Sequence, residues 1–294
     1  GTEGIGTGFS TFIPPFNPTD IIANLYNIMN GKKFKEMKPY WKGFTGVVRK
    51  LDKTSFEVTG LYSIKNNKLI INELPVGTWT QSYKEFLEKL YETDSNKNKE
   101  DRVFIGFKEF HTDTTVHFEL EFIPNYIETV VNIVKDFHLS SKVSLTNMTL
   151  YSVNGNIKKY DSPQHIMLEY YETRLELYEQ RKQHLLNCMK NTLDIISNKV
   201  KFILMVVENK LSINNRKKSE IVLDLIKHKF PQLSNNDNIS FDYLLTMPIY
   251  QLTFEKIEAL KKQMNEKQIQ YDGLFATNSL DIWKGELEEL EKML

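Results

Sequence analysis

The most suggestive chemistry in the sequence is a basic segment in which lysines alternate with aromatic residues. It runs from Lys32 to Lys38 and leads into Tyr40, Trp41 and Lys42. Lysines grouped in this way can hold a phosphate backbone, because each ammonium group that neutralises a phosphate releases a counterion. A solvated lysine surface without a ligand is an equally weighted alternative. The segment is therefore a candidate phosphate-binding surface.

Signatures of catalysis and of metal binding are missing from the sequence. There is no Walker A loop, no HExxH, no CxxC and no nucleophile elbow. The glycines of residues 4–8 are spaced as in a phosphate loop but lack the βαβ context that such a loop needs. His111 and His117 would share one face of a strand, yet no third ligand is near, so a structural role is favoured. We assign no catalytic residue, no metal ligand and no cofactor to this chain.

The composition is that of a folded protein without a charge bias. The 38 basic and 38 acidic side chains cancel, so only a local patch can bind nucleic acid, and 40% of the residues are hydrophobic. The single cysteine, Cys188, excludes an internal disulfide and favours a reducing compartment. The longest apolar run, residues 202–207, is too short to span a membrane, so we expect no membrane partner. The chain begins at Gly1 without an initiator methionine, and we expect it to be a fragment.

Residues 1–160 combine short strands with a few helices. Period-two alternation predicts strands at 56–64, 68–74 and 115–122, with a further strand opening at 43–49. Asn66 and Asn67 predict a hairpin turn. Helices are predicted at 18–30, 81–92 and 124–137. The polar stretch 94–101 is predicted to be an exposed loop.

A long helix is predicted to begin at Ser162, where an N-cap residue precedes a proline. Its apolar seam comprises Tyr171, Leu175, Tyr178, Leu185, Met189, Leu193, Ile196, Val200, Ile203 and Val207, with Lys182 at one seam position. Steps of three and four alternate except for two consecutive fours around Met189, which indicates a heptad seam with one stutter. A helix over residues 162–209 would be roughly 70 Å long.

A second seam returns after a compact insert at residues 211–253. Its positions are Ile257, Leu260, Met264, Lys267, Tyr271, Leu274, Trp283, Leu287, Leu290 and Leu294, with a break at 277–279. Within the insert we predict a helix at 218–229 and an apolar segment at 241–245. The pattern favours an antiparallel two-helix arm with a small helical knob at its tip. Two core helices of a globular bundle are the alternative.

Several longer motifs resemble those of type IIA DNA topoisomerases of the eukaryotic and large-DNA-virus kind. They are EGIGTGFSTFIPPFNP (3–18), ELPVGTWTQSYKEFL (73–87), HTDTTVHFE (111–119), IKKYDSP (157–163) and FDYLLTMPIYQLTFEKIEAL (241–260). The motifs come in the family's order and cover nearly the whole chain.

The resemblance implies an α+β fold. A β-rich tower, or shoulder, domain at residues 1–160 would support one arm of the bent gate DNA. A long antiparallel coiled-coil arm would follow, with its outgoing helix at 161–210 and its returning helices at 254–294. A small helical gate domain at its tip, residues 211–253, would form the dimeric exit gate, or C-gate.

The family's full-length enzyme is an ATP-dependent DNA topoisomerase that passes one duplex through a transient double-strand break in another. The resemblance implies ATP and Mg²⁺ as its cofactors and places the catalytic tyrosine, the metal-binding domain and the ATPase upstream of this chain. We therefore expect the fragment alone to be inactive. We expect an intracellular protein at DNA, in the nucleus of a eukaryote or in the host cytoplasm for a cytoplasmic virus. The compact gate favours a viral or protist enzyme.

The partners implied are double-stranded DNA and a second copy of the chain. Candidate DNA-binding residues are Lys32, Lys33, Lys35, Lys42 and Arg49. Candidate contacts of the dimer gate are Leu244, Leu245, Met247, Ile249 and Tyr250, each with even odds of serving the core of the knob instead. A non-catalytic coiled-coil adaptor with a β-rich head is the alternative function.

Overall fold

The computed structural model describes residues 1–98, 101–235 and 238–294. The chain forms two compact units, which are described separately below. The first comprises Gly1–Thr173 and Leu290–Leu294, and the second comprises Arg174–Glu289. In the described ranges, every helix is too short or too polar to cross a membrane.

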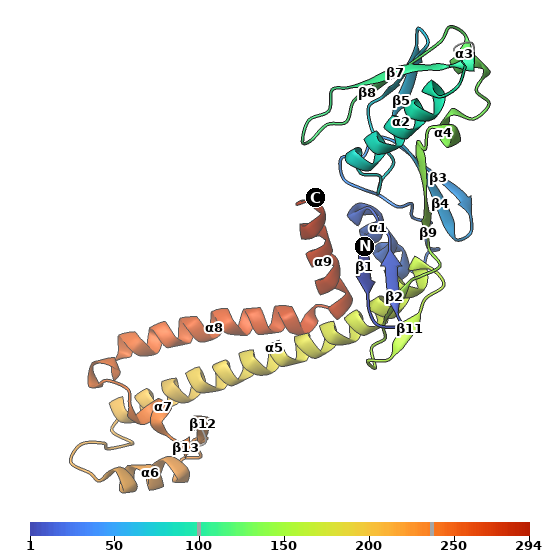
Figure 1. Cartoon of the computed structure of the whole chain (residues 1–294). Helices are drawn as coiled ribbons and strands as arrows, with labels where there is room; N and C mark the ends of the chain where they lie inside the picture. Colours follow the sequence, from blue (N-terminus) through green and yellow to red (C-terminus); the bar gives the residue numbers. More distant parts are fainter. Residues whose placement is uncertain (99–100, 236–237) are drawn as a thin grey trace. The chain divides into compact units, whose positions relative to one another are not determined.

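The first unit is built from small antiparallel sheets and short helices (Figure 1). One sheet joins β3 (Val47–Asp52), β4 (Ser55–Thr59) and β9 (Ser140–Ser144), and a second has the order β5 (Tyr62–Lys65), β6 (Lys68–Ile71), β8 (Phe118–Phe122), β7 (Phe104–Glu109). Two hairpins are formed by β1 (Thr2–Ile5) with β2 (Ser10–Ile13) and by β10 (Thr149–Tyr151) with β11 (Ile157–Lys159). The helices include α1 (Pro18–Met29) and α2 (Thr80–Ser95). Mixed helices and small antiparallel sheets confirm the α+β class.

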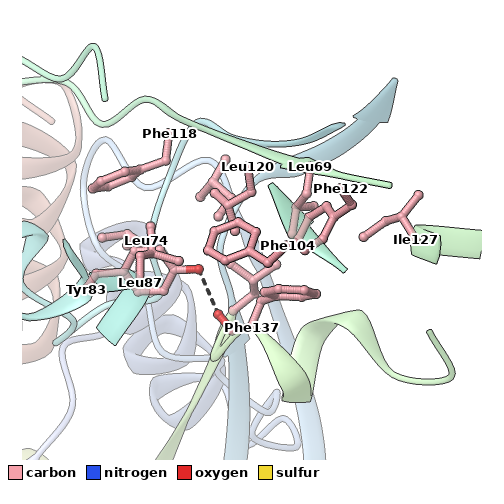
Figure 2. Close-up of a cluster of buried hydrophobic side chains, with 12 residues drawn as sticks. Leu69, Leu74, Tyr83, Leu87, Phe104, Phe118, Leu120, Phe122, Ile127 and Phe137 are labelled. Carbon is pink, nitrogen blue, oxygen red and sulfur yellow. Dashed lines mark hydrogen bonds between the residues drawn. The ribbon is translucent and has the colours of Figure 1, made fainter. Parts of the chain in front are cut away.

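Helix α2 covers the four-stranded sheet and closes the main core of this unit (Figure 2). Its apolar residues recur at the i, i+4 spacing of a helix face, and Tyr83 and Leu87 are both buried. They pack against Leu120 and Phe118 of β8. The buried Tyr83 hydroxyl donates a hydrogen bond to the carbonyl of Phe137 at 2.8 Å, and burial raises the pKa of this phenol. The core therefore fixes α2 to the chain that leads into β9.

The single strand predicted at 56–64 is wrong, because the chain changes sheet at Gly60. Strand β4 ends at Thr59, and β5 begins at Tyr62 in the other sheet. A Cβ atom at Gly60 would lie 2.1 Å from the carbonyl oxygen of Glu73, so only glycine allows this close approach of two backbones. The hairpin turn is confirmed: Asn66 and Asn67 have φ of 47° and 63° between the paired β5 and β6.

The helix predicted at 124–137 is also wrong. Two one-turn helices occupy this range, α3 (Tyr126–Thr129) and α4 (Ile133–Asp136), separated by an extended residue at Val130. The side chain of Asn132 accepts a hydrogen bond from the Lys135 amide at 3.1 Å and thereby starts α4 anew. The β-branched pair of Val130 and Val131 adds little helix propensity to bridge the gap.

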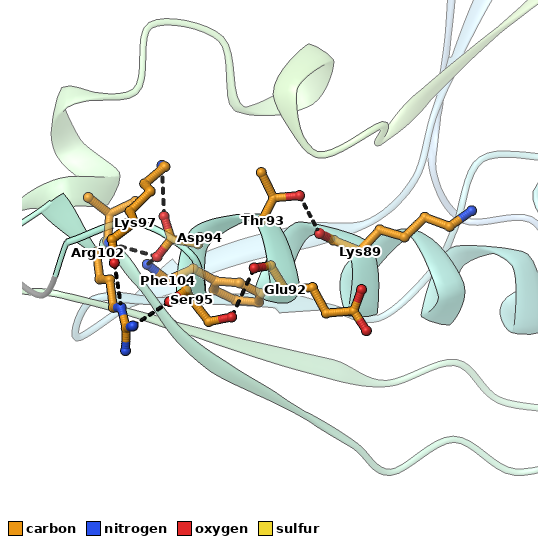
Figure 3. Close-up of polar contacts among 9 residues, drawn as sticks. Lys89, Glu92, Thr93, Asp94, Ser95, Lys97, Arg102 and Phe104 are labelled. Atoms are coloured by element: carbon orange, nitrogen blue, oxygen red, sulfur yellow. Dashed lines mark hydrogen bonds and ion pairs between the residues drawn. The ribbon is translucent and has the colours of Figure 1, made fainter.

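The exposed loop predicted at 94–101 is wrong at its first residue, and Lys99 and Glu100 lie outside the described residues. Asp94 is buried at the end of α2, and its carboxylate accepts hydrogen bonds from the amides of Val103 and Phe104, both at 2.9 Å (Figure 3). Lys97 contacts the same carboxylate at 2.8 Å. Burial opposes ionisation, but these three donors outweigh it and hold the pKa of Asp94 below its ordinary value. The carboxylate joins α2 to the start of β7.

The second unit contains two long helices that run antiparallel. They are the part of α5 (Pro163–Val207) from Arg174 onward and α8 (Phe254–Ala276), and Figure 1 shows them side by side. The Lys182 ammonium donates to the carbonyl of Phe275 at 3.2 Å, whereas Ile203 shares a buried cluster with Ile257. The beginning of one helix therefore meets the end of the other. Ser162 caps α5 through its hydroxyl, which confirms the predicted helix start.

The insert between the long helices is small and combines short helices with a hairpin. It contains α6 (Lys218–Lys227), the hairpin of β12 (Leu233–Asn235) and β13 (Asn238–Ser240), α7 (Asp242–Leu245) and the 3₁₀ helix η2 (Ile249–Gln251). Its core packs Leu225, Phe230 and Leu244 against the adjoining ends of α5 and α8. The helix and the apolar segment predicted for this insert are confirmed.

The break predicted at 277–279 is confirmed by the start of α9 (Ser279–Glu291), where Asn278 accepts a hydrogen bond from the Leu280 amide at 3.1 Å. An aromatic pair then ties α9 to α5: the rings of Tyr178 and Trp283 stack with centroids 5.4 Å apart. Glu286 accepts a hydrogen bond from the Tyr178 hydroxyl and pairs with Arg181 at 2.9 Å. Burial and the Glu286 carboxylate both raise the pKa of Tyr178.

The predicted apolar seam of α5 differs from the structure at one position. Leu186 is 5% exposed and Leu185 is 37% exposed, so the structure buries the neighbour of the predicted seam residue. The two consecutive steps of four therefore run from Tyr178 through Lys182 to Leu186, one turn before the predicted stutter.

Replacing each of these leucines by alanine tests the corrected register. We expect Leu186→Ala to lower the free energy of unfolding by about 2–4 kcal/mol, because it leaves a cavity in a packed seam. Leu185→Ala serves as the matched control and is expected to cost less than about 1 kcal/mol. Denaturant unfolding followed by circular dichroism measures both. Equal losses of unfolding free energy in the two variants, or a larger loss for Leu185→Ala, would contradict the assignment of Leu186 to the seam.

Candidate functional site

The predicted basic segment forms an ordered strap on the first unit, which we call the lysine strap (residues 31–42). The amide of Lys32 donates to the Asn27 carbonyl at 2.7 Å, and the amide of Tyr40 donates to the Pro15 carbonyl at 2.9 Å. The side chain of Met37, within the strap, is buried. The backbone is therefore tethered at both ends and its lysine side chains are left to solvent.

Five lysines of the strap are exposed, namely Lys32, Lys33, Lys35, Lys38 and Lys42. Among the described residues none of the five has an acidic partner within ion-pair distance. The single acidic residue of the strap, Glu36, is instead paired with Lys50 of β3. The strap thus carries uncompensated positive charge, which suits an anionic ligand.

Arg49 differs from the other predicted DNA contacts. Its guanidinium pairs with Glu57 of the neighbouring strand at 2.8 Å, although the side chain remains 70% exposed. Part of its charge is therefore already neutralised, and the strap lysines are the better phosphate ligands.

The glycine-rich segment at residues 4–8 covers the end of β1 and the turn that leads into β2. The Gly6 amide donates to the Phe9 carbonyl at 2.8 Å, and the chain continues into a strand, not into a helix. Ile5, the last residue of β1, is 92% exposed beside this turn. Together with Phe9, Tyr151 and Ile157 it borders a shallow cavity of about 270 Å³ between the two hairpins. We call these four residues the hairpin surface.

The predicted histidine pair has structural contacts. His117 contacts Asn72 at 2.9 Å and Glu119 at 3.4 Å, and His111 lies 3.9 Å from Glu109. Within the described ranges, no group of three or more His, Cys, Asp or Glu residues is placed to hold a metal ion.

The predicted gate residues separate into core and surface. Leu244 is 1% exposed and belongs to the core of the insert, which is the alternative that the sequence left open for it. Leu245 and Met247 are half-buried against the same core. Ile249 and Tyr250 are 82% and 76% exposed on η2. They and the exposed Phe254 are large apolar side chains outside the buried core, and we call these three residues the gate surface.

The comparisons with known proteins agree with one another. The family model that describes the A subunit of DNA gyrase and topoisomerase IV matches residues 1–288. The chain belongs to the type IIA DNA topoisomerase family. Its relatives include DNA topoisomerase 2 of Pisum sativum, 35% identical over 99% of this chain and 22% of that protein. DNA topoisomerase 2 of Acanthamoeba polyphaga mimivirus is 32% identical over 98% of this chain and 28% of that protein.

A solved structure supports the same family. The Plasmodium falciparum topoisomerase II DNA-binding, cleavage and re-ligation domain matches with a TM-score of 0.83 and 32% identity, over 99% of this chain and 42% of that chain. This type IIA topoisomerase chain therefore spans less than a third of the curated relatives named above. Relatives from eukaryotes and from a large DNA virus fit the predicted origin.

Sequence reasoning missed three features of this type IIA topoisomerase chain. Lys38 lies in the predicted basic segment but not among the candidate DNA contacts, and it is one of the exposed cations of the strap; Phe254 extends the gate surface. Ile5 is the third, and the sequence held a signal for it: an isoleucine between two glycines has no neighbouring side chain with which to form a core.

Proposed function

We propose that this chain supports the bent gate DNA and forms the dimeric exit gate of an ATP-dependent type IIA DNA topoisomerase. The full-length enzyme would pass one duplex through a transient double-strand break in another. The observation that carries the DNA-binding part is the lysine strap, whose five exposed lysines have no acidic partner in the part of the chain that the structure describes. Phosphate contacts of this kind position DNA without reading its sequence.

Removing three strap lysines is expected to weaken DNA binding and its salt dependence. Each phosphate contact contributes about 0.9 to the slope of log K against log salt, so Lys32→Gln, Lys33→Gln and Lys35→Gln together should lower the slope by about 2 to 3. Fluorescence anisotropy with a labelled duplex at several salt concentrations measures it. Lys84→Gln, which breaks an ion pair with Glu109 elsewhere in the unit, is the matched control. An unchanged slope in the triple variant would refute the DNA assignment.

The hairpin surface supplies a means of bending the duplex. Apolar side chains that enter the minor groove unstack a base step and kink the DNA, and Ile5 is exposed at the end of β1, next to the hairpin turn. Bending costs on the order of 1–6 kcal/mol, which phosphate contacts offset.

Ile5→Ala is expected to reduce bending more than binding. The end-to-end distance of a doubly labelled duplex, followed by energy transfer, should rise in the complex with the variant while the salt slope stays the same. The control is Val153→Ala, which changes an exposed apolar residue in the turn between β10 and β11. Equal bending by Ile5→Ala and the wild-type chain would exclude a wedge role.

The second unit supports the exit-gate proposal. Two antiparallel helices lead to the small insert, and the gate surface lies at η2 and the first residue of α8. An apolar patch of this kind suits a two-fold contact between identical chains. The domain boundaries proposed from the sequence are kept, with the tower at 1–160, the outgoing helix at 161–210, the knob at 211–253 and the returning helices at 254–294.

Cleavage chemistry is not assigned to residues 1–294. The family implies ATP and Mg²⁺ in the full-length enzyme, but the described residues offer no cluster of metal ligands that would hold the ion. We place the catalytic tyrosine outside this chain, and we expect the protein to act where DNA is, in the nucleus or in the host cytoplasm. The alternative, a coiled-coil adaptor without a DNA role, predicts no gel shift with a bent or nicked duplex.

A further inference from the structure

Asn24 is a buried polar side chain with no part in the proposed function so far. It lies on α1 and is 1% exposed. Its amide nitrogen donates to the carbonyl of Lys35 at 2.9 Å, and its amide oxygen accepts from the amide of Lys35 at 2.8 Å. One side chain thus satisfies both backbone groups of a residue in the middle of the lysine strap. A buried amide with both ends paired is an expensive contact to lose, because either partner would be left unsatisfied.

The second observation concerns the one carboxylate of the strap. Glu36 lies between Lys35 and Lys38, where it would repel the phosphates that the lysines attract. Lys50 of β3 pairs with it. Both side chains are substantially exposed, so the pair adds little to stability. Its effect is on the local charge of the strap.

We propose that Asn24 and Lys50 are positioning residues for DNA binding: Asn24 fixes the backbone of the lysine strap, and Lys50 neutralises its only acidic side chain. A strap that is ordered before binding loses less conformational entropy when its lysines engage phosphates. When Lys50 neutralises Glu36, no carboxylate of the strap lowers the positive potential of its five lysines. Neither residue needs to touch DNA. The proposal rests on the strap being a DNA contact, as proposed above.

A double-mutant cycle tests Asn24. The salt slope of duplex binding is measured for the wild-type chain, Asn24→Ala, the triple lysine variant and the quadruple combination, with the melting temperature of each. We expect Asn24→Ala to lower the slope by about one to two units, and to have no effect once the three lysines are gone. If Asn24→Ala acted only by destabilising the fold, it would weaken DNA binding equally in the wild-type chain and in the triple lysine variant. Asp94→Ala removes another buried side chain that holds backbone amides, far from the strap in sequence, and should lower the melting temperature without changing the slope.

A second cycle uses surface substitutions that do not endanger folding. Lys50→Gln is expected to weaken DNA binding several-fold, because it releases the Glu36 carboxylate. Glu36→Gln is expected to strengthen binding, and Lys50→Gln in the Glu36→Gln background should then have little further effect. If Lys50→Gln lowered DNA affinity equally in the wild-type chain and in the Glu36→Gln variant, Lys50 would act on DNA directly and its positioning role would be overturned.

The two proposals fail in different ways. If the triple lysine variant keeps the wild-type slope, the strap is not a DNA contact and the proposed function fails. If the triple variant loses slope but Asn24→Ala does not, or if Asn24→Ala lowers affinity equally in both backgrounds, the strap binds DNA without help from Asn24 and its positioning role is overturned.

Discussion

Replacing Ile249 by aspartate and Tyr250 by serine is expected to convert the dimer that we propose forms through the gate surface into a monomer. Both side chains are more than three-quarters exposed and neither belongs to the buried core, so the exchange removes contact area and adds a charge without disturbing the fold. Apolar and tyrosine anchors at the centre of an interface each contribute about 2–4 kcal/mol, so we expect the dissociation constant to rise at least about a hundredfold. Sedimentation velocity at several concentrations measures it.

The insert offers a matched control for this variant. Leu223 on α6 is 66% exposed and apolar, yet it lies outside the gate surface. Leu223→Asp should leave the dissociation constant unchanged. If Leu223→Asp produced a monomer while the variant with Ile249 and Tyr250 exchanged stayed dimeric, the dimer contact would lie on α6 and not on the gate surface. A wild-type chain that stays monomeric at tens of micromolar would contradict dimerisation through this unit.

Gly60→Ala is expected to destabilise the first unit more than any other single substitution proposed for it. The new methyl group would lie 2.1 Å from the carbonyl oxygen of Glu73 and 3.0 Å from the carbonyl carbon of Leu74. These are backbone atoms that cannot turn away, so the chain must separate where it passes from β4 to β5. Overpacking usually costs about 1–3 kcal/mol, and we expect at least the upper end of that range.

Thermal unfolding of the first unit measures this effect, and Gly106→Ala is the control. Gly106 lies in β7 of the same unit, and a Cβ atom added there would meet no other atom within 4 Å. Alanine there should be neutral or slightly stabilising, because it restricts the unfolded chain. Equal melting temperatures for the two variants would show that the backbones at Gly60 can move apart without cost.

The long helices were predictable from the sequence because their signals are local and repeated. Ser162 and Pro163 mark the start of α5, and Asn278 marks the break between α8 and α9. The choice between Leu185 and Leu186 was not predictable, because both are leucines and a stutter can be placed at either. The packing partner decides between them.

The errors in the first unit have a different cause. Alternation continues through residues 56–64, and nothing local shows that the backbone of Glu73, beyond the end of β6, approaches Gly60. Asp94 was predicted to be exposed because its neighbours are polar, but its partners lie at the start of β7, nine and ten residues further along. Contacts distant in sequence decided both cases.

The candidate site was predictable in kind and less so in detail. Lysines between aromatic residues indicated the strap, but the tether from Asn24 to Lys35 joins residues eleven positions apart and has no sequence signal. For the proposed gate, the motif indicated a segment, whereas the exposure of Ile249 and the burial of Leu244 required the fold.

The most direct test of the account is to lock the gate in a full-length protein that contains this chain. Cys188 is exposed and is the only cysteine of these 294 residues, so the background combines Cys188→Ser with replacement of any exposed cysteine in the rest of the full-length protein. Tyr250→Cys then carries a linker that a reductant can cleave. We predict that linked dimers form, that they lose multiple-turnover strand passage between duplexes, and that cleavage of the linker restores it. A fully linked dimer that passes strands at the unlinked rate would contradict the exit gate.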